Sequence, residues 1–182
     1  MIIDKKISYP CFCVSNYDVI KSILFFVKKN NLPVIIESTS SQVNQFGGYT
    51  NKTPKQFKTM IYDLCKKIKF PLSQVILGGD HLGHFPWRKR KKKLANRNAA
   101  NLVKACLDAG YKKIHIDTSH KLLDDFTFEK RKALNRSQEL AKLLKKKKIF
   151  PIFGTEVPFP GSKVQKKIKL TSVNDLGNEI DF

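Results

Sequence analysis

Apolar runs typical of strands alternate with amphipathic helical segments along the chain, and this alternation constrains the fold more than any other feature. We expect strands at residues 7–14, 34–36, 75–77, 114–116 and 150–153. Apolar side chains that recur every three or four positions predict the intervening helices, at 19–29, 53–68, 94–109 and 128–147. Such a strict alternation predicts an α/β protein with a parallel sheet.

The number of these units is lower than a closed barrel requires. A barrel of eight strand–helix units needs about 250 residues, whereas this chain has 182. No linker, internal repeat or low-complexity tract divides the sequence. We therefore expect a single domain over residues 1–182 that is truncated after its fifth strand.

Four polar stretches close the second to fifth strand-like runs, at residues 37–50, 78–83, 115–120 and 154–161. They bring carboxylates, imidazoles and glycines to the carboxyl ends of successive strands, where a parallel barrel carries its chemistry. We therefore expect these stretches to form one site at the same end of the sheet.

Asp80 and His81 give the strongest catalytic signal. A metal held by an imidazole polarises a substrate carbonyl while a neighbouring carboxylate moves a proton. Asp80 is therefore the first acid–base candidate, and Glu156, after the fifth strand, is the second. The alternative is that Asp80 caps the following loop and His81 forms a hydrogen bond inside the barrel.

His81 is also the expected metal ligand. Tetrahedral zinc needs at least three protein ligands, and by analogy with neighbouring loops His120 and Glu156 are further candidates. We expect His84 to be a solvated loop residue and His115 to be a satisfied histidine within the core.

The polar stretch after the second strand is expected to bind substrate. Its carboxylate should face the mouth of the barrel, and its hydroxyls, amides and unhindered backbone N–H groups suit sugar hydroxyls or a phosphate. The alternative is a polar loop that packs on the rim. With two residues after the fourth strand, the substrate-binding candidates are Glu37, Ser38, Asn44, Gln45, Gly47, Gly48, Asp117 and Ser119.

The chain is strongly basic, with a net charge of +20 from 30 lysines and 5 arginines against 15 acidic residues. Biased composition is the simplest explanation, and scarce arginine weakens the readout of bases. Six adjacent cations at 88–93 follow Trp87 and suit attraction of phosphates or nucleic acid. We interpret this run as a solvated surface and expect no nucleic-acid partner.

Cysteine spacing and hydropathy indicate the cellular compartment in which the protein resides. Cys11, Cys13, Cys65 and Cys106 lack the spacing of a metal site, and reduced thiols indicate an intracellular protein. No run approaches the roughly 18 apolar residues of a membrane span. We therefore expect a cytoplasmic protein without a membrane partner.

From about residue 7 to 175 the sequence resembles the accessory, non-catalytic subunit of class II D-tagatose-1,6-bisphosphate aldolase, a family also labelled tagatose-6-phosphate kinase. The most specific part is the stretch 37–50, which ends in Phe-Gly-Gly-Tyr-Thr. The resemblance implies a TIM (β/α)8-barrel fold, present here as an incomplete barrel of about five parallel strands. No phosphate-binding loop or kinase signature supports the kinase label.

The same resemblance suggests roles for individual residues. Asp80-His81 matches the position where catalytic class II aldolases place a proton-transferring aspartate beside a first zinc ligand. Residues 116–120 look like an Ile-Asp-Gly-Ser-His stretch with Thr118 in place of glycine, and Glu156 matches an acidic position. The two other zinc histidines of those aldolases follow later strands, so we expect little site-specific affinity for zinc or another divalent metal.

We therefore predict a carbohydrate-metabolism protein that supports a catalytic class II aldolase subunit and shows no independent turnover. Its implied partners are that subunit, or a chain supplying the missing half-barrel, and a sugar phosphate. One alternative is a metal-dependent sugar or sugar-phosphate aldolase or epimerase that uses Asp80 and Glu156. The other is a basic nucleic-acid-binding module.

Overall fold

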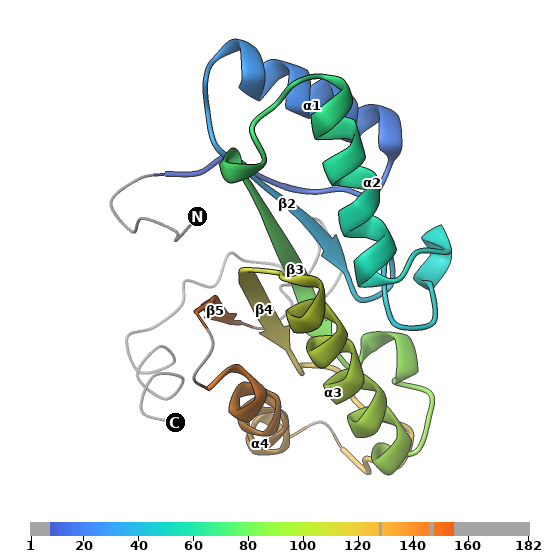
Figure 1. Cartoon of the computed structure of the whole chain (residues 1–182). Coiled ribbons are helices and arrows are strands. Elements are labelled where there is room, and N and C mark those ends of the chain that lie inside the picture. The colour runs from blue at the N-terminus through green and yellow to red at the C-terminus, as the bar shows by residue number, and fades with distance from the viewer. Residues whose placement is uncertain (1–7, 128, 146–147, 155–182) are drawn as a thin grey trace, which may run out of the picture.

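The computed structural model describes residues 8–127, 129–145 and 148–154. Five strands form one parallel sheet in which each strand pairs with the next along the chain, as Figure 1 shows. The strands are β1 (Cys11–Cys13), β2 (Val34–Thr39), β3 (Val75–Gly83), β4 (Lys113–Asp117) and β5 (Phe150–Phe153). The prediction of five parallel strands in sequential order is confirmed.

Helices follow the first four strands and lie on one face of the sheet (Figure 1). They are α1 (Tyr17–Lys29), α2 (Pro54–Lys67), α3 (Lys92–Ala109) and α4 (Lys130–Ala141), with short 3-10 helices η1 (Gly48–Thr50), η2 (Leu72–Gln74), η3 (Phe85–Trp87) and η4 (Lys142–Leu144). We call the opposite face of the sheet the inner face. Among the described residues, no helix covers it.

Local signals in the sequence explain where the helices begin and end. The Asn16 side chain accepts two backbone N–H groups at the start of α1. At α2, Thr53 and Gln56 form a reciprocal capping box and Pro54 occupies the first turn, where its missing N–H costs nothing. Gly110 ends α3 in a left-handed conformation.

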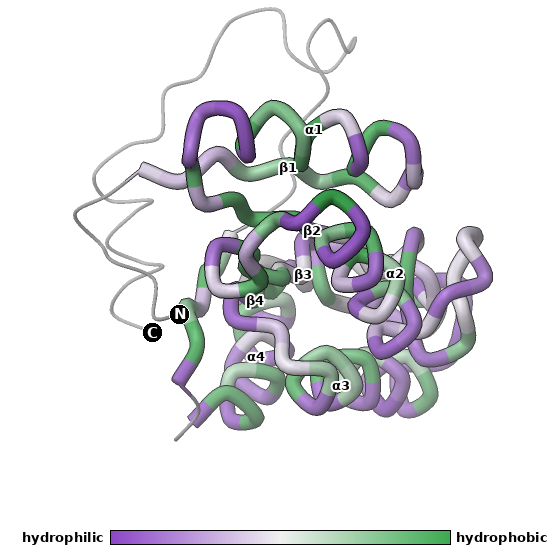
Figure 2. The backbone as a smooth tube through the Cα atoms, turned by 45° about the horizontal axis from the view of Figure 1, so that its top comes forward, coloured by the Kyte–Doolittle hydropathy of each residue, from purple (hydrophilic) through white to green (hydrophobic). Residues whose placement is uncertain are grey.

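The core lies between the helices and the outer face of the sheet. Side chains alternate between the two faces along a strand, so one set from each strand packs under the helices. The largest fully buried aliphatic and Phe side chains include Ile20, Leu24, Ile36, Phe57, Ile61, Leu77, Leu102 and Ile114. Figure 2 shows the helices alternating between hydrophilic and hydrophobic positions, as amphipathic helices covering one face of a sheet do.

Some element boundaries differ from the prediction. β3 continues for six residues beyond the expected 75–77 and includes Asp80 and His81, because its polar end pairs with β2 and, after a register shift, with β4. β1 is shorter than expected, and α4 begins at Lys130 and ends at Ala141.

Candidate functional site

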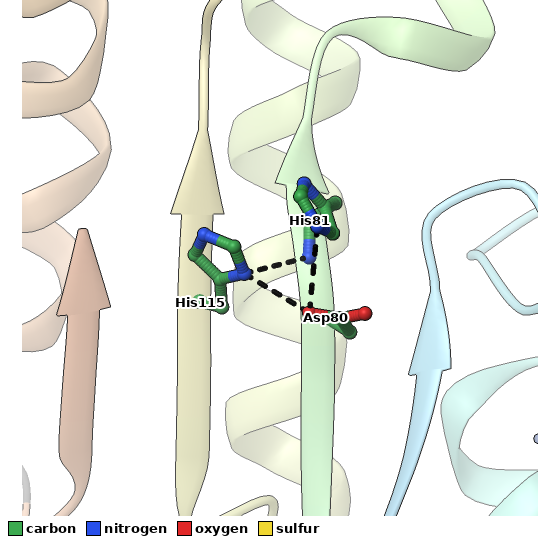
Figure 3. A group of neighbouring side chains, drawn as sticks. All are labelled: Asp80, His81 and His115. Atoms are coloured by element: carbon green, nitrogen blue, oxygen red, sulfur yellow. Dashed lines mark hydrogen bonds and ion pairs between the residues drawn. The ribbon is translucent and has the colours of Figure 1, made fainter. Parts of the chain in front are cut away.

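Asp80, His81 and His115 gather on the inner face, near the carboxyl ends of β3 and β4 (Figure 3). Successive residues of a regular strand point to opposite faces. The register between β3 and β4 shifts between Gly79 and Leu82, and His81 has a left-handed φ of 47°. This irregularity places Asp80 and His81 beside each other, and strained backbone of this kind is concentrated at functional sites.

The three side chains are close enough to hold one metal ion. One ligand atom from each lies within 4.8 Å of the other two. Nδ1 of His115 is 3.0 Å from Oδ1 of Asp80, and Nε2 of His81 is 3.9 Å from the same oxygen. Imidazole and carboxylate donors at this spacing suit Zn²⁺ and related divalent ions.

Asp117 orients His81. Its Oδ2 is 2.9 Å from Nδ1 of His81, while Oδ1 accepts hydrogen bonds from the Ser119 N–H at 2.8 Å and the Ser119 hydroxyl at 2.6 Å. Burial raises the pKa of Asp117, but these hydrogen bonds outweigh it and lower the pKa to about 2. A carboxylate holding one imidazole nitrogen while the other faces a metal is a common arrangement around ligating histidines.

Close packing of β3 against β4 allows this contact. A Cβ added to Gly83 would lie 1.7 Å from the carbonyl oxygen of Asp117, so a larger residue would push the strands apart.

Asp80 is ionised at neutral pH. Burial raises its pKa, but hydrogen bonds from His115 and Cys13 and the charges of the two imidazoles leave the pKa below its ordinary value. Cys13 belongs to β1, and burial together with the Asp80 carboxylate raises the pKa of its thiol to about 12. The thiol is therefore protonated, and it donates to Oε1 of Gln42 at a distance of 3.8 Å.

A second layer of side chains lies below this cluster on the inner face. Glu37 of β2 is buried and forms an ion pair with Lys113 of β4. The pair passes over Gly78, where an added Cβ would lie 2.5 Å from Oε1 of Glu37. Substrate binding by Glu37 stays a prediction, and its carboxylate already has a buried cationic partner.

The other candidates in the 37–50 stretch use their polar atoms within the protein. The Ser38 hydroxyl lies on the opposite face of β2, 3.5 Å from the Tyr111 hydroxyl. Asn44 accepts the N–H groups of Phe46 and Gly48 and donates to the Ser40 carbonyl.

Gln45 and the two glycines complete this loop. The Gln45 amide donates to the Asn98 carbonyl of α3 at 3.0 Å. Gly47 and Gly48 have positive φ, and a Cβ on Gly48 would lie 2.4 Å from the Gln42 carbonyl oxygen. These contacts favour the alternative of a loop that packs on the rim, and substrate binding by its residues stays a prediction.

Two expectations about histidines were wrong. His84 is 2% exposed rather than solvated, because the chain turns into η3 and carries the ring inward. Burial and the Arg136 charge lower its pKa to about 4. His115 was expected in the core, yet its ring lies on the inner face beside Asp80. Its place two residues before Asp117, on the same face of one strand, was the signal for this.

Of the remaining predicted ligands, His120 is not part of the cluster. The His120 ring packs against Phe85 at a centroid distance of 4.7 Å. Glu156 lies outside the described residues, and so does its expected convergence with Asp80.

The parallel sheet, its outer helices and an Asp/His cluster near the strand ends define an α/β domain of the TIM-barrel type. Residues 3–182 match the family model described as "D-tagatose-1,6-bisphosphate aldolase subunit GatZ/KbaZ-like". The chain belongs to this family, as the resemblance in the sequence predicted.

Curated relatives agree with this assignment. The chain is 35% identical over 178 residues to "D-tagatose-1,6-bisphosphate aldolase subunit GatZ" of Escherichia coli O1:K1 / APEC, and 34% identical over 178 residues to the protein of the same name from Shigella flexneri serotype 5b (strain 8401). Each match covers 92% of this chain and 42% of the relative. The chain thus spans less than half the length of these relatives.

Solved structures show the same fold. A "probable tagatose 6 phosphate kinase from Sinorhizobium meliloti 1021" superposes with a TM-score of 0.81 at 27% identity, over 96% of this chain and 43% of that one. The YdjI aldolase of Escherichia coli K12 superposes with a TM-score of 0.50 at 16% identity, over 80% and 44% of the two chains. The prediction of an incomplete TIM barrel is confirmed. Within the described residues, none of the helices has the length and apolar character needed to cross a membrane.

Proposed function

We propose that this chain acts in the cytoplasm as an accessory subunit of a class II D-tagatose-1,6-bisphosphate aldolase. In this role it supports a catalytic subunit and has no turnover of its own. Membership of the family and 35% identity to a named aldolase subunit support the proposal. A barrel enzyme builds its site from loops after all its strands, and the described residues supply only the first of these.

The site contributed by this chain is proposed to bind a divalent metal through Asp80, His81 and His115. The contact between His81 and Asp117 carries this proposal, because it presents the Nε2 nitrogen toward Asp80. From the sequence, one ligand was counted and weak binding was expected. His115 and the Asp80 carboxylate bring the number to three, which is the minimum for a zinc site.

A bound divalent ion would polarise a carbonyl or hydroxyl oxygen of a sugar phosphate. Asp80 is ionised and lies 3.0 Å from His115, so it is placed to hold or accept a proton next to that oxygen. Ser119 is placed by Asp117 at the same strand end, where its hydroxyl is a candidate contact to the sugar. The excess of lysine favours the approach of phosphates.

Addition of the chain to a catalytic class II aldolase subunit tests the accessory role. We expect the mixture to cleave the ketohexose bisphosphate faster, or to keep its activity longer at elevated temperature, than the catalytic subunit alone. The control is the same chain heat-denatured beforehand. An unchanged rate and half-life, with no complex in sedimentation, would refute the accessory role.

The rival function is a metal-dependent aldolase or epimerase in its own right. The close contact of Asp80 with two imidazoles favours it. Turnover by the purified chain in the presence of Zn²⁺, abolished by Asp80→Asn, would establish this rival in place of the accessory role.

A further inference from the structure

Exposed apolar side chains gather at the carboxyl end of the sheet, in the segments that follow β2, β3 and β4 (Figure 1). Phe46 and Tyr49 are 69% and 70% exposed, and Phe126 is 97% exposed. Single apolar residues scattered over a surface need no explanation, whereas a contiguous group marks an interaction site. We call this surface the mouth collar, and its apolar members are Phe46, Tyr49, Phe85, Leu123 and Phe126.

Contacts between the three segments make the mouth collar one surface. The Phe46 ring, after β2, packs edge-on against Trp87 of η3, with ring centroids 6.3 Å apart. Phe85, also in η3, packs against the His120 ring that follows β4. The rings of the collar are therefore held side by side by residues from neighbouring strand ends rather than dispersed over separate loops.

A cationic rim borders the mouth collar. Residues 89–93 are exposed, and none of them forms an ion pair within the described part of the chain. The Arg88 guanidinium lies 4.0 Å from the centroid of the Phe85 ring and joins the rim to the rings. The Asp124 carboxylate accepts the Lys92 N–H at 2.8 Å, which fixes the segment after β4 to the start of α3. The rim thus carries positive charge that an acidic surface would neutralise.

We propose that the mouth collar is the surface on which the catalytic aldolase subunit docks, and that the docked face of that subunit presents an apolar pocket bordered by carboxylates. This inference rests on the proposed accessory role. It adds the place where the two chains meet and the chemistry of the partner's face. The Asp80–His81–His115 cluster, near the carboxyl ends of β3 and β4, would then lie beside the interface.

The composition of the mouth collar matches a protein interface. Such interfaces place aromatic anchors at the centre of the contact and polar or charged side chains around them. A second copy of this chain does not suit the collar, because two cationic rims would face one another in a symmetric contact and repel. The chain has 35 cationic and only 15 acidic residues, so the complementary charge has to come from a different chain.

Single-stranded nucleic acid is the rival occupant, because cations beside exposed rings also bind phosphates and stack on bases. Leu123 is 61% exposed within the collar, and an aliphatic side chain offers no ring for stacking. The curated relatives are named as subunits of an aldolase. Both observations favour a protein face over a nucleic acid.

A binding titration of the full 182-residue chain with a purified catalytic class II aldolase subunit tests the inference. We expect Phe46→Ser/Phe126→Ser to weaken binding about tenfold or more, as the loss of aromatic anchors does. Phe26 of α1 is 60% exposed and lies outside the collar. Phe26→Ser is therefore the matched control, and its binding should stay within about twofold of the parent chain.

Neutralising the cationic rim should slow the association of the two chains. We expect Lys89→Gln/Lys93→Gln to lower the association rate about threefold or more at low salt and to reduce its salt dependence, because charges at a rim steer the encounter. Lys21 of α1 and Lys104 of α3 are exposed as well. Lys21→Gln/Lys104→Gln removes the same charge outside the collar and should leave the rate almost unchanged.

The outcomes separate this inference from the accessory role on which it rests. If the parent chain and all collar variants bind the catalytic subunit equally well, the collar is not the docking surface and the accessory role stands. If the parent chain does not bind the subunit, both are wrong. A single-stranded DNA oligonucleotide is titrated in parallel. Binding of DNA that Phe46→Ser/Phe126→Ser abolishes, with binding of the subunit left intact, would assign the collar to nucleic acid and overturn the inference.

A measurement on the unaltered chain covers the case in which the variants fail to fold. Acetylation of lysines is followed by mass spectrometry, with and without the catalytic subunit. We expect the subunit to protect the lysines of residues 89–93 about fivefold or more, because an interface excludes reagent from its rim only when the partner is seated. Lys21 and Lys104 should be labelled equally in both samples. Equal labelling of residues 89–93 in the free chain and in the complex would overturn the inference.

Discussion

The loop after β2 and the cluster on β3 and β4 are both polar and both follow apolar strand segments, but their side chains interact with different partners. In the loop, Asn44 and Gln45 bond to backbone groups of the protein itself. In the cluster, Asp80, His81 and His115 turn toward one another on the inner face. A polar residue after a strand therefore indicates a site only where its atoms are not used to hold the loop.

The largest effect on ligand binding is expected from His81→Ala. This change removes the nitrogen that Asp117 orients, so we expect the affinity of the chain for Zn²⁺ to fall more than about 100-fold. The metal-free chain should also lose roughly 1–3 kcal/mol of stability, because the buried Asp117 carboxylate loses a hydrogen-bond partner. Calorimetric titration measures the Zn²⁺ affinity and urea unfolding measures the stability. An unchanged Zn²⁺ affinity would show that the cluster, like the loop, is not a metal site.

The layer below the cluster gives the largest expected effect on stability. Lys113→Met leaves Glu37 buried without its cationic partner, and losing one member of a buried pair costs about 3 kcal/mol. The double variant Glu37→Gln/Lys113→Met should recover most of this loss in urea unfolding. If the single and double variants are equally stable, the pair is not coupled as the structure indicates.

The fold was predictable because its signals are local. The capping box at Thr53 and Gln56 and the glycine after α3 lie within a few residues of the boundaries they specify. The polar end of β3 was not predictable from local signals. The segment Gly78 to Gly83 has loop-like composition and becomes a strand only by pairing with β2 and β4.

At the site, the positions of two histidines were likewise not predictable from local sequence. The burial of His84 depends on how the chain turns into η3, and the position of His115 depends on the register of β4. Neither can be inferred from a short window of sequence. Asp80, His81 and Asp117 were found because they stand at strand ends. The place of His115 beside Asp80 was missed because its neighbours in the chain are apolar.

Asn44→Ala tests whether the polar side chains of the loop after β2 stabilise the fold rather than bind metal. Two backbone N–H groups and one carbonyl lose their partner in a buried setting, and we expect the free energy of unfolding to fall by about 2 kcal/mol. Zn²⁺ affinity should stay within about twofold of the parent chain. Urea unfolding and calorimetry check both, with Gln56→Ala at the exposed α2 cap as a control. A large loss of metal affinity would show that the loop and cluster act together.

The smallest expected effect concerns the pH dependence of stability and the buried ring of His84. Its pKa is about 4 in the folded chain against 6.5 ordinarily, so the unfolded chain binds the proton more readily. The stabilisation is complete above about pH 6.5 and is lost as the pH falls toward 4. Between pH 7 and 5 the free energy of unfolding should fall by about 1–2 kcal/mol through this residue. His84→Gln should flatten that part of the curve in urea unfolding. An equal slope in the parent chain and His84→Gln would mean that the ring is solvated in solution.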